Sequence, residues 1–151
     1  MHHASTIFAL SSGPGRAGIA VIRVSGPAAR QVVARMAAPM GKPRVACFRT
    51  IRHPETAEAL DKAVVIFFEA ARSETGEDVT ELQVHGGRAV VKAVLAALAL
   101  IPGCRPAEAG EFARRAFENG KLDLAEVEGL ADLVDAETEA QRRQEIGRAH
   151  V

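Results

Sequence analysis

The chain has 151 residues, 48% of them hydrophobic and 25% charged, which is the composition of a folded domain with one hydrophobic core. Lys plus Arg and Asp plus Glu both number 19, so no net charge draws the whole molecule to nucleic acid or to an anionic membrane. The first five residues lack the features of a signal peptide, and the longest apolar run, Ala93 to Ile101, is too short to cross a bilayer. We therefore expect a cytoplasmic protein with no membrane association. Cys47 and Cys104 stand far apart, which predicts buried thiols and no zinc site.

The first third of the chain predicts two strands joined by a glycine-rich turn. The strands are Thr6 to Leu10 and Ile19 to Ser25, and the turn between them fits neither the dinucleotide-binding nor the Walker pattern. The second strand is apolar on both faces except for Arg23. A buried, unpaired guanidinium is very costly, so Arg23 must either lie at a sheet edge or meet an anion. The sequence leaves both alternatives open.

The middle of the chain predicts a helix and two more strands. Pro27 lies in the first turn of the helix, and Val32, Val33, Met36 and Met40 form its apolar stripe. Val45 to Arg52 is expected to be an exposed strand with Cys47 or Phe48 turned inward. Lys62 to Glu69 is expected to be a strand that is buried on both faces.

The strand predicted from Val79 to His85 carries the most informative polar pattern. Alternation places Thr80, Leu82 and Val84 on one face, and Glu81, Gln83 and His85 on the other. The polar face is either the solvated side of an antiparallel sheet or the wall of a ligand site. We expect His85 to support the Gly86-Gly87 turn, because no serine or cysteine partner for it is evident.

Three helices are predicted in the C-terminal part. They run from Arg88 to Ile101, from Ala107 to Glu118 and from Leu122 to Gln144. Phe112, Ala116 and Ala113 form the buried stripe of the second. The apolar stripe of the third has nothing later in the chain to cover it. The irregular order of strands and helices favours an α+β domain with a mixed sheet of about five strands, followed by a long C-terminal helix.

Several short stretches together resemble the N-terminal part of the MnmE family (also called TrmE), bacterial GTPases of tRNA wobble-uridine modification. Their order and spacing across the chain carry the resemblance. The stretches are Thr6-Ile7-Phe8-Ala9, Pro14 to Gly26, Thr75-Gly76-Glu77-Asp78-Val79, Glu81-Leu82-Gln83, His85-Gly86-Gly87, Gly110-Glu111-Phe112, Arg115-Ala116-Phe117 and Asn119-Gly120-Lys121-Leu122-Asp123-Leu124.

The resemblance implies a folate-binding domain similar to the aminomethyltransferase-type module. It implies that residues 1–121 form a dimerising domain that binds a tetrahydrofolate derivative, either 5-formyl- or 5,10-methylene-tetrahydrofolate. Residues 122–144 would be the first helix of a helical domain. Residues 145–151 match the in-frame translation of a common sequencing adapter, so we expect them to be a non-native tail. Residues that match Arg23, Glu81 and Lys121 would contact the folate.

The same resemblance implies a homodimer and, for the full-length family, tRNA and the FAD-dependent protein MnmG as partners. GTP, Mg²⁺ and K⁺ would belong to a GTPase domain that this chain lacks, so we expect the chain alone neither to hydrolyse GTP nor to modify tRNA. Glu74, where the family usually has an aromatic residue, and Glu108-Ala109, in place of Arg-Pro, would lower the affinity for an anionic folate. The alternatives are a stand-alone aminomethyltransferase-like enzyme and a dimerisation domain without a ligand.

Overall fold

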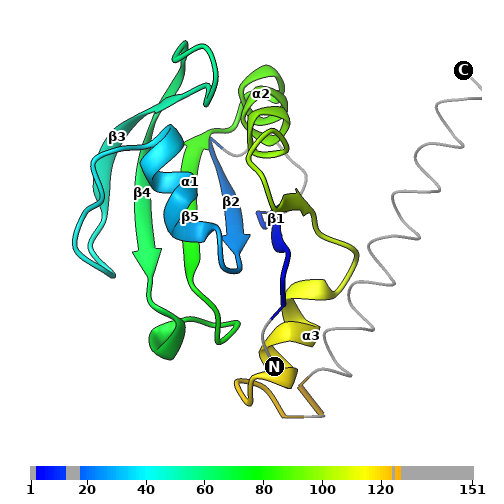
Figure 1. Ribbon diagram of the computed structural model, residues 1–151. Helices are drawn as coiled ribbons and strands as arrows, with labels where there is room; N and C mark the ends of the chain where they lie inside the picture. The colour runs from blue at the N-terminus through cyan, green and yellow to red at the C-terminus, as the bar shows by residue number, and fades with distance from the viewer. Residues whose placement is uncertain (1–2, 13–17, 124, 127–151) are drawn as a thin grey trace, which may run out of the picture.

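The computed structural model describes residues 3–12, 18–123 and 125–126. Within them the chain forms an α+β fold with a mixed sheet of six strands in the order β3-β4-β5-β2-β1-β6 (Figure 1). All neighbouring strands are antiparallel except β1 and β6, which are parallel. The elements are β1 (Thr6–Leu10), β2 (Ile19–Ser25), α1 (Ala29–Met36), β3 (Cys47–Arg52), β4 (Ala59–Phe68), the short 3-10 helix η1 (Ala70–Arg72), β5 (Val79–His85), α2 (Arg88–Leu98), β6 (Cys104–Pro106) and α3 (Glu111–Glu118).

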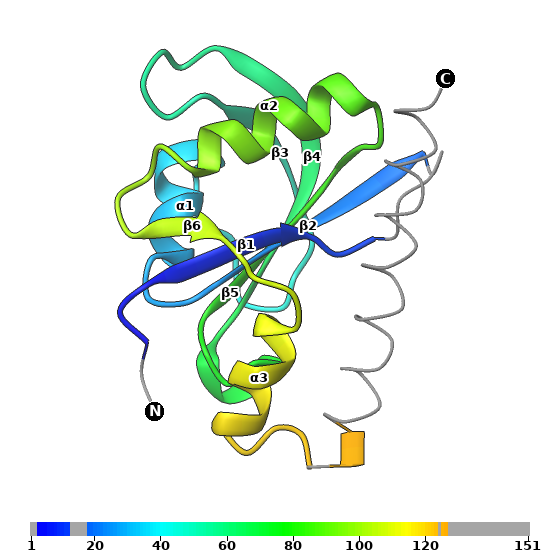
Figure 2. The same cartoon turned by 90° about the vertical axis from the view of Figure 1, so that its right-hand side faces the viewer.

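The hydrophobic core lies between one face of the sheet and the helices α1 and α2 (Figures 1 and 2). Val32 and Val33 of α1 and Leu98 of α2 pack there against Ile22 and Leu82 of the two central strands. The third helix, α3, lies apart from α1 and α2, below the sheet in both views. The other face of the sheet is therefore left without a layer of helices among the described residues.

The predicted bounds of β1, β2 and β5 are confirmed, and three other predictions are corrected. The strand β4 alternates between buried and half-buried residues and is not buried on both faces, because α1 and α2 cover only one face of the sheet. The sheet has a sixth strand, β6, which was not predicted. The edge strand β3 begins at Cys47 and not at Val45. It turns Ile51 inward, with Cys47 half-buried on the same face, and leaves Phe48 65% exposed, so of the two residues predicted to turn inward only Cys47 does.

Helices α2 and α3 are shorter than predicted. After Leu98 the chain makes i to i−3 hydrogen bonds at Leu100 and Ile101, which tighten the turn and end α2. Before α3, the Ala107 amide donates to the Phe8 carbonyl at 2.9 Å, so this segment continues along β1 and does not begin the helix. The predicted helix from Leu122 to Gln144 and the tail 145–151 lie outside the described residues, except for 122, 123, 125 and 126.

Cys47 and Cys104 are free thiols. Both are half-buried, whereas the sequence predicted full burial. Burial raises the pKa of the Cys104 thiol, which disfavours its reactive thiolate form. In the described part of the chain, no helix has the length and apolar character needed to span a bilayer.

Candidate functional site

Two adjoining pockets lie beside α3 and the uncovered face of the sheet. The larger has a volume of about 640 Å³, and Lys121 and α3 residues line it. The smaller, of about 180 Å³, is lined by Glu81 and Phe68. Arg23, Glu74 and Thr75 line both pockets, so the two pockets meet at these residues. The structure thus brings the three residues Arg23, Glu81 and Lys121 to one region.

Glu81 reaches the smaller pocket from the middle of β5. The alternation predicted for this strand is present: Leu82 and Val84 are buried in the core, while Glu81 and Gln83 are half-buried on the opposite face. The Gln83 amide donates a hydrogen bond to Glu81 Oε1 at 2.9 Å. No described residue donates to Oε2, so this oxygen can accept a hydrogen bond from a ligand.

Arg23 lies in β2, directly opposite Glu81 in the strand register. Because β2 is flanked by β5 and β1, Arg23 is not at a sheet edge, and the alternative that it meets an anion holds. The anion is Glu74: Arg23 Nη2 and Glu74 Oε2 are 2.9 Å apart. The Glu74 side chain is 77% exposed and that of Arg23 is 29% exposed, so a ligand carboxylate could replace Glu74 at little cost.

Lys121 follows the last turn of α3 and lines the larger pocket. Its Nζ donates to the Ala71 carbonyl at 3.0 Å, and the side chain is otherwise exposed. An ammonium group held by a single neutral acceptor keeps its charge available for an anion. The two cations, Arg23 and Lys121, therefore face one cavity from different segments of the chain.

The apolar wall of the larger pocket comes from α3. Phe112 and Ala113 are half-buried there, and Ala116 is buried. The predicted stripe of this helix was therefore right for Ala116 and only partly right for the other two residues. Their apolar surface faces the pocket, where it can contact the flat part of a ligand.

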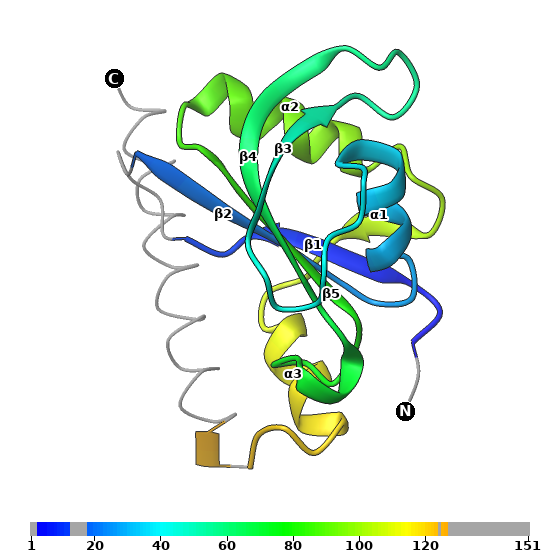
Figure 3. The ribbon, with the colours of Figure 1, turned by 90° about the vertical axis from the view of Figure 1, so that its left-hand side faces the viewer.

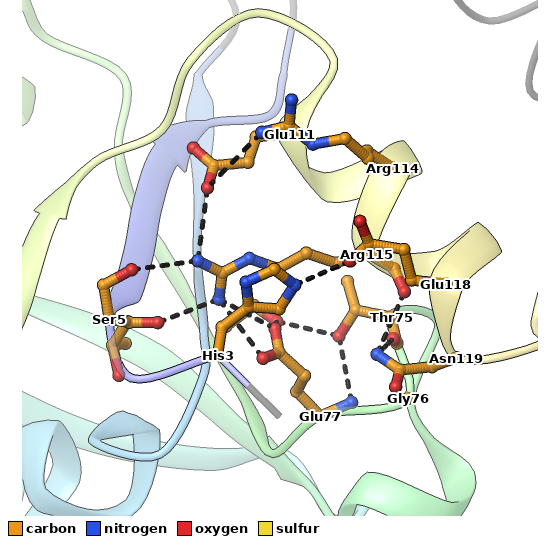
Figure 4. Close-up of polar contacts among 12 residues, drawn as sticks. His3, Ser5, Thr75, Gly76, Glu77, Glu111, Arg114, Arg115, Glu118 and Asn119 are labelled. Carbon is orange, nitrogen blue, oxygen red and sulfur yellow. Dashed lines mark hydrogen bonds and ion pairs between the residues drawn. The ribbon is translucent and has the colours of Figure 1, made fainter. Parts of the chain in front are cut away.

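A buried ionic network on the opposite side of α3 holds this wall in place (Figure 4). The guanidinium of Arg115 is fully buried and lies 3.1 Å from Glu77 Oε1 and 3.2 Å from Glu111 Oε2. It also donates to the Ser5 carbonyl at 2.9 Å. Glu77 in turn accepts from the Ser25 hydroxyl at 2.9 Å. The network ties α3 to β2, to the N-terminal segment and to the loop that carries Glu74 and Thr75.

Glu111 is the second buried carboxylate of the network. Arg105 Nη1 and Nη2 donate to its two oxygens at 2.8 and 2.6 Å. This hydrogen bonding lowers the pKa of Glu111 from 4.5 to about 2, so the carboxylate stays charged at neutral pH. The sequence did not predict the network. The spacing of Glu111 and Arg115, four residues apart on one helix face, was the available signal.

His85 does not support the glycine turn as expected. Its Nδ1 lies 2.8 Å from Asp61 Oδ1, and its backbone amide donates to Asp61 Oδ2 at 2.8 Å. The imidazole is therefore fixed to β4, and its side chain is 69% exposed. The Gly86 amide instead donates to the Gly18 carbonyl at 3.0 Å, so backbone contacts hold that turn.

Comparisons with known proteins give one consistent result. Residues 6–121 match the model of the family described as GTP-binding protein TrmE N-terminus. The chain is 61% identical over 142 residues to the tRNA modification GTPase MnmE of Parvibaculum lavamentivorans, covering 93% of the chain and 32% of that protein. It is 60% identical over 144 residues to the human mitochondrial 5-taurinomethyluridine-[tRNA] synthase subunit GTPB3, covering 94% of the chain and 29% of that protein. The chain thus spans about a third of the length of these relatives.

Proposed function

Because the chain belongs to the family of the GTP-binding protein TrmE N-terminus, we propose that it is the folate-binding and dimerisation part of a tRNA wobble-uridine modification GTPase. In this proposal the two adjoining pockets hold a one-carbon derivative of tetrahydrofolate, either 5-formyl- or 5,10-methylene-tetrahydrofolate. One observation carries the proposal: a carboxylate lies in the small pocket, an ammonium lies in the large one, and Arg23 lies between them.

The chemistry of the lining residues fits the two ends of a folate. A pterin presents an amino group and a ring N–H side by side, and the half-buried carboxylate of Glu81 can accept both. The benzoyl-glutamate tail is anionic, and Arg23 and Lys121 are cations that border the larger pocket. A volume of about 640 Å³ is in the range of cofactor sites. When bound, the folate would supply a one-carbon unit.

The chain's own residues would bind and orient this ligand. Glu81 would fix the pterin, Phe112 would cover part of its surface against water, and the two cations would hold the tail. Glu74 competes with the ligand for Arg23, because it already pairs with that guanidinium at 2.9 Å. We therefore expect this chain to bind the folate more weakly than a variant with a neutral side chain at position 74.

The roles of the whole protein are part of the same proposal. The bacterial relative is named a tRNA modification GTPase and the human one a 5-taurinomethyluridine-[tRNA] synthase subunit, and we propose that this chain serves tRNA modification as well. We also propose a homodimer through residues 1–121, MnmG as a partner protein and a cytoplasmic location. In the full-length family, the GTPase domain would bind GTP together with Mg²⁺ and K⁺.

Equilibrium titration with 5-formyl-tetrahydrofolate tests the proposal. We expect saturable binding to the parent chain. Glu81→Ala should weaken it about 10- to 100-fold, because hydrogen bonds to a charged group contribute about 1.5 to 3 kcal/mol each. The control Glu55→Ala, an exposed residue of the β3–β4 loop, should bind like the parent. Absence of binding to the parent would favour the alternative of a dimerisation domain without a ligand.

A further inference from the structure

The balanced total charge hides a strong asymmetry along the chain. The first 54 residues contain eight Lys or Arg residues and no Asp or Glu. The remaining 97 residues contain all 19 acidic residues and 11 of the 19 basic ones. Six of the N-terminal cations fall between positions 26 and 54, the segment that forms α1, β3 and the connection between them; they are Arg30, Arg35, Lys42, Arg44, Arg49 and Arg52.

The elements that carry these six cations lie on one side of the molecule, where α1 lies beside the β3–β4 hairpin and away from α3 (Figure 3). The guanidinium of Arg30 stacks over the Phe67 ring at 4.6 Å from its centroid. The Arg44 amide donates to the Phe67 carbonyl at 2.7 Å, which brings the α1–β3 connection to the same point. Phe67 thus joins α1, β4 and this connection. We call the surface formed by the six cations the α1–β3 basic face.

Two other cations of the basic face, one in β3 and one in α1, bind backbone carbonyls of neighbouring segments. The Arg49 side chain donates to the Pro39 carbonyl at 2.9 Å, and Arg35 reaches the Pro54 carbonyl at 3.5 Å. All the residues of the basic face except the half-buried Arg49 are exposed, including Arg52 at the end of β3. The face therefore runs from Phe67 to the far end of an edge strand that is six residues long.

None of the six cations forms an ion pair with a carboxylate among the described residues. In other parts of the described chain, four arginines lie within 4.0 Å of a carboxylate: Arg23, Arg105, Arg114 and Arg115. The cations there that lack such a partner are spread over β4, η1, α2 and the segment after α3; they are Lys62, Arg72, Arg88, Lys92 and Lys121. Unpaired arginines on one face produce a local positive potential even when the net charge is zero. Their planar guanidinium groups match phosphate oxygens in pairs.

We propose that the α1–β3 basic face binds the phosphate backbone of RNA. An anionic membrane is the competing polyanion, but the large apolar side chains of α1, Val32, Val33 and Met36, are buried in the core. Helices that lie on membranes instead present such side chains to the lipid. The RNA surface is separate from the folate pockets, since none of the six cations lines them. The inference therefore stands or falls independently of folate binding.

The test compares two pairs of neutralising substitutions in the whole chain, with a fluorescently labelled RNA stem-loop as the probe. The variant Lys42→Gln/Arg44→Gln changes the basic face, where neither side chain makes a hydrogen bond to a described residue. The control Arg88→Gln/Lys92→Gln removes two exposed cations from α2 and changes the net charge by the same amount. Urea unfolding of both variants checks that they remain folded.

We expect the parent to bind the RNA with an affinity that falls as salt rises. The basic-face variant should bind about tenfold more weakly, and its slope of log affinity against log salt should be shallower by about 0.7 to 0.9 for each lost contact. The control should stay within about twofold of the parent, since a phosphate contact is lost only where the RNA lies. Equal weakening by both variants, or no binding at low salt, would overturn the inference. Binding of the parent to phosphatidylserine vesicles in preference to RNA would also overturn it.

Discussion

Arg115 has the most demanding environment of any cation that the structure describes. Its side chain is fully buried, with two carboxylates at 3.1 and 3.2 Å and a backbone carbonyl at 2.9 Å. Its Nε is buried without a hydrogen-bond partner among the described residues. Among the described residues Glu77 has its ion pair with Arg115 alone, whereas Glu111 also pairs with Arg105. Arg115 is therefore a structural requirement for the wall of the larger pocket.

Replacing Arg115 by methionine should destabilise the fold by about 3 to 5 kcal/mol, because the substitution leaves Glu77 and Glu111 buried with less positive charge. The matched control is Arg114→Met, one residue earlier on α3. That side chain is 57% exposed and lies 4.0 Å from Glu111, so its loss should cost less than about 1 kcal/mol. Urea unfolding at neutral pH measures both. A loss below about 1 kcal/mol for Arg115→Met would show that the network does not stabilise the fold.

Glu111 gives the fold a specific dependence on pH. The hydrogen bonds from Arg105 lower its pKa from 4.5 to about 2 in the folded chain. A carboxyl group with a lowered folded pKa stabilises the fold above its unfolded pKa, and this contribution disappears as the pH falls through the folded pKa. The stability contributed by Glu111 should therefore be fully present above about pH 5 and should be lost between about pH 5 and pH 2.

Urea unfolding between about pH 7 and pH 3 checks this prediction by comparing the parent with Glu111→Gln. The variant lacks the titrating group, so the stability difference between the two proteins should shrink by about 2 kcal/mol as the pH falls over this range. The exposed residue Glu108 supplies the control, and Glu108→Gln should follow the pH profile of the parent. A difference between parent and Glu111→Gln that stays constant with pH would contradict the assignment.

At the scale of elements, the contact between the 73–78 loop and the end of α3 decides the shape of the larger pocket. The Asn119 side chain donates to the Thr75 carbonyl at 3.0 Å, and Gly76 lies against it. A Cβ atom at position 76 would overlap the Asn119 Cβ. The Gly76 backbone also has a φ of +79°, a conformation that other residues rarely adopt.

The substitution Gly76→Ala should therefore cost more stability than the same change at Gly103. Gly103 has a similar φ of +85°, but nothing lies within 4 Å of the place that an alanine methyl group would take, so Gly103→Ala reports the backbone strain alone. We expect about 1 to 2 kcal/mol for Gly103→Ala, and about 1 to 3 kcal/mol more for Gly76→Ala. Denaturant unfolding measures the difference. Equal losses at the two positions would mean that the loop and α3 separate easily.

The sequence predicted those elements whose signals are local. The strands β1, β2 and β5 have alternating or apolar runs bounded by turn residues, and their bounds are confirmed. The strand β6 was missed, because its three residues include Pro106 and are too few to show a period. The burial of β4 was predicted wrongly, because an apolar run does not tell how many of its faces a helix will cover.

The site was less accessible to sequence reasoning than the sheet. Local patterns marked Arg23 and the polar strand face that carries Glu81, and the resemblance to a family joined them with Lys121. The common location of the three depends on how distant segments meet. The pairing of Arg23 with Glu74 depends on the position of a loop. Arg115 and Glu111 look like ordinary exposed helix residues in the sequence, because the partners that bury them, Ser5 and Glu77 for Arg115 and Arg105 for Glu111, lie outside the helix. The α1–β3 basic face was hidden because the charges were counted over the whole chain.

At the scale of the whole molecule, the proposed folate binding depends on how the two adjoining pockets are lined. Glu81 and Arg72 line the smaller pocket, Lys121 lines the larger, and Arg23 lines both. If the smaller pocket holds the pterin, Glu81 should recognise only that end of the folate. Lys121, which lines the larger pocket alone, should recognise only the tail. The two ends can be separated, because p-aminobenzoyl-glutamate carries the tail without the pterin.

The most direct measurement is therefore a calorimetric titration of the parent, Glu81→Gln and Lys121→Gln with both 5-formyl-tetrahydrofolate and p-aminobenzoyl-glutamate. We predict that Glu81→Gln binds the complete folate at least about tenfold more weakly but binds the tail fragment like the parent. Lys121→Gln should weaken the binding of both ligands. If Glu81→Gln binds the complete folate as tightly as the parent, the carboxylate does not hold the pterin and the central claim is wrong.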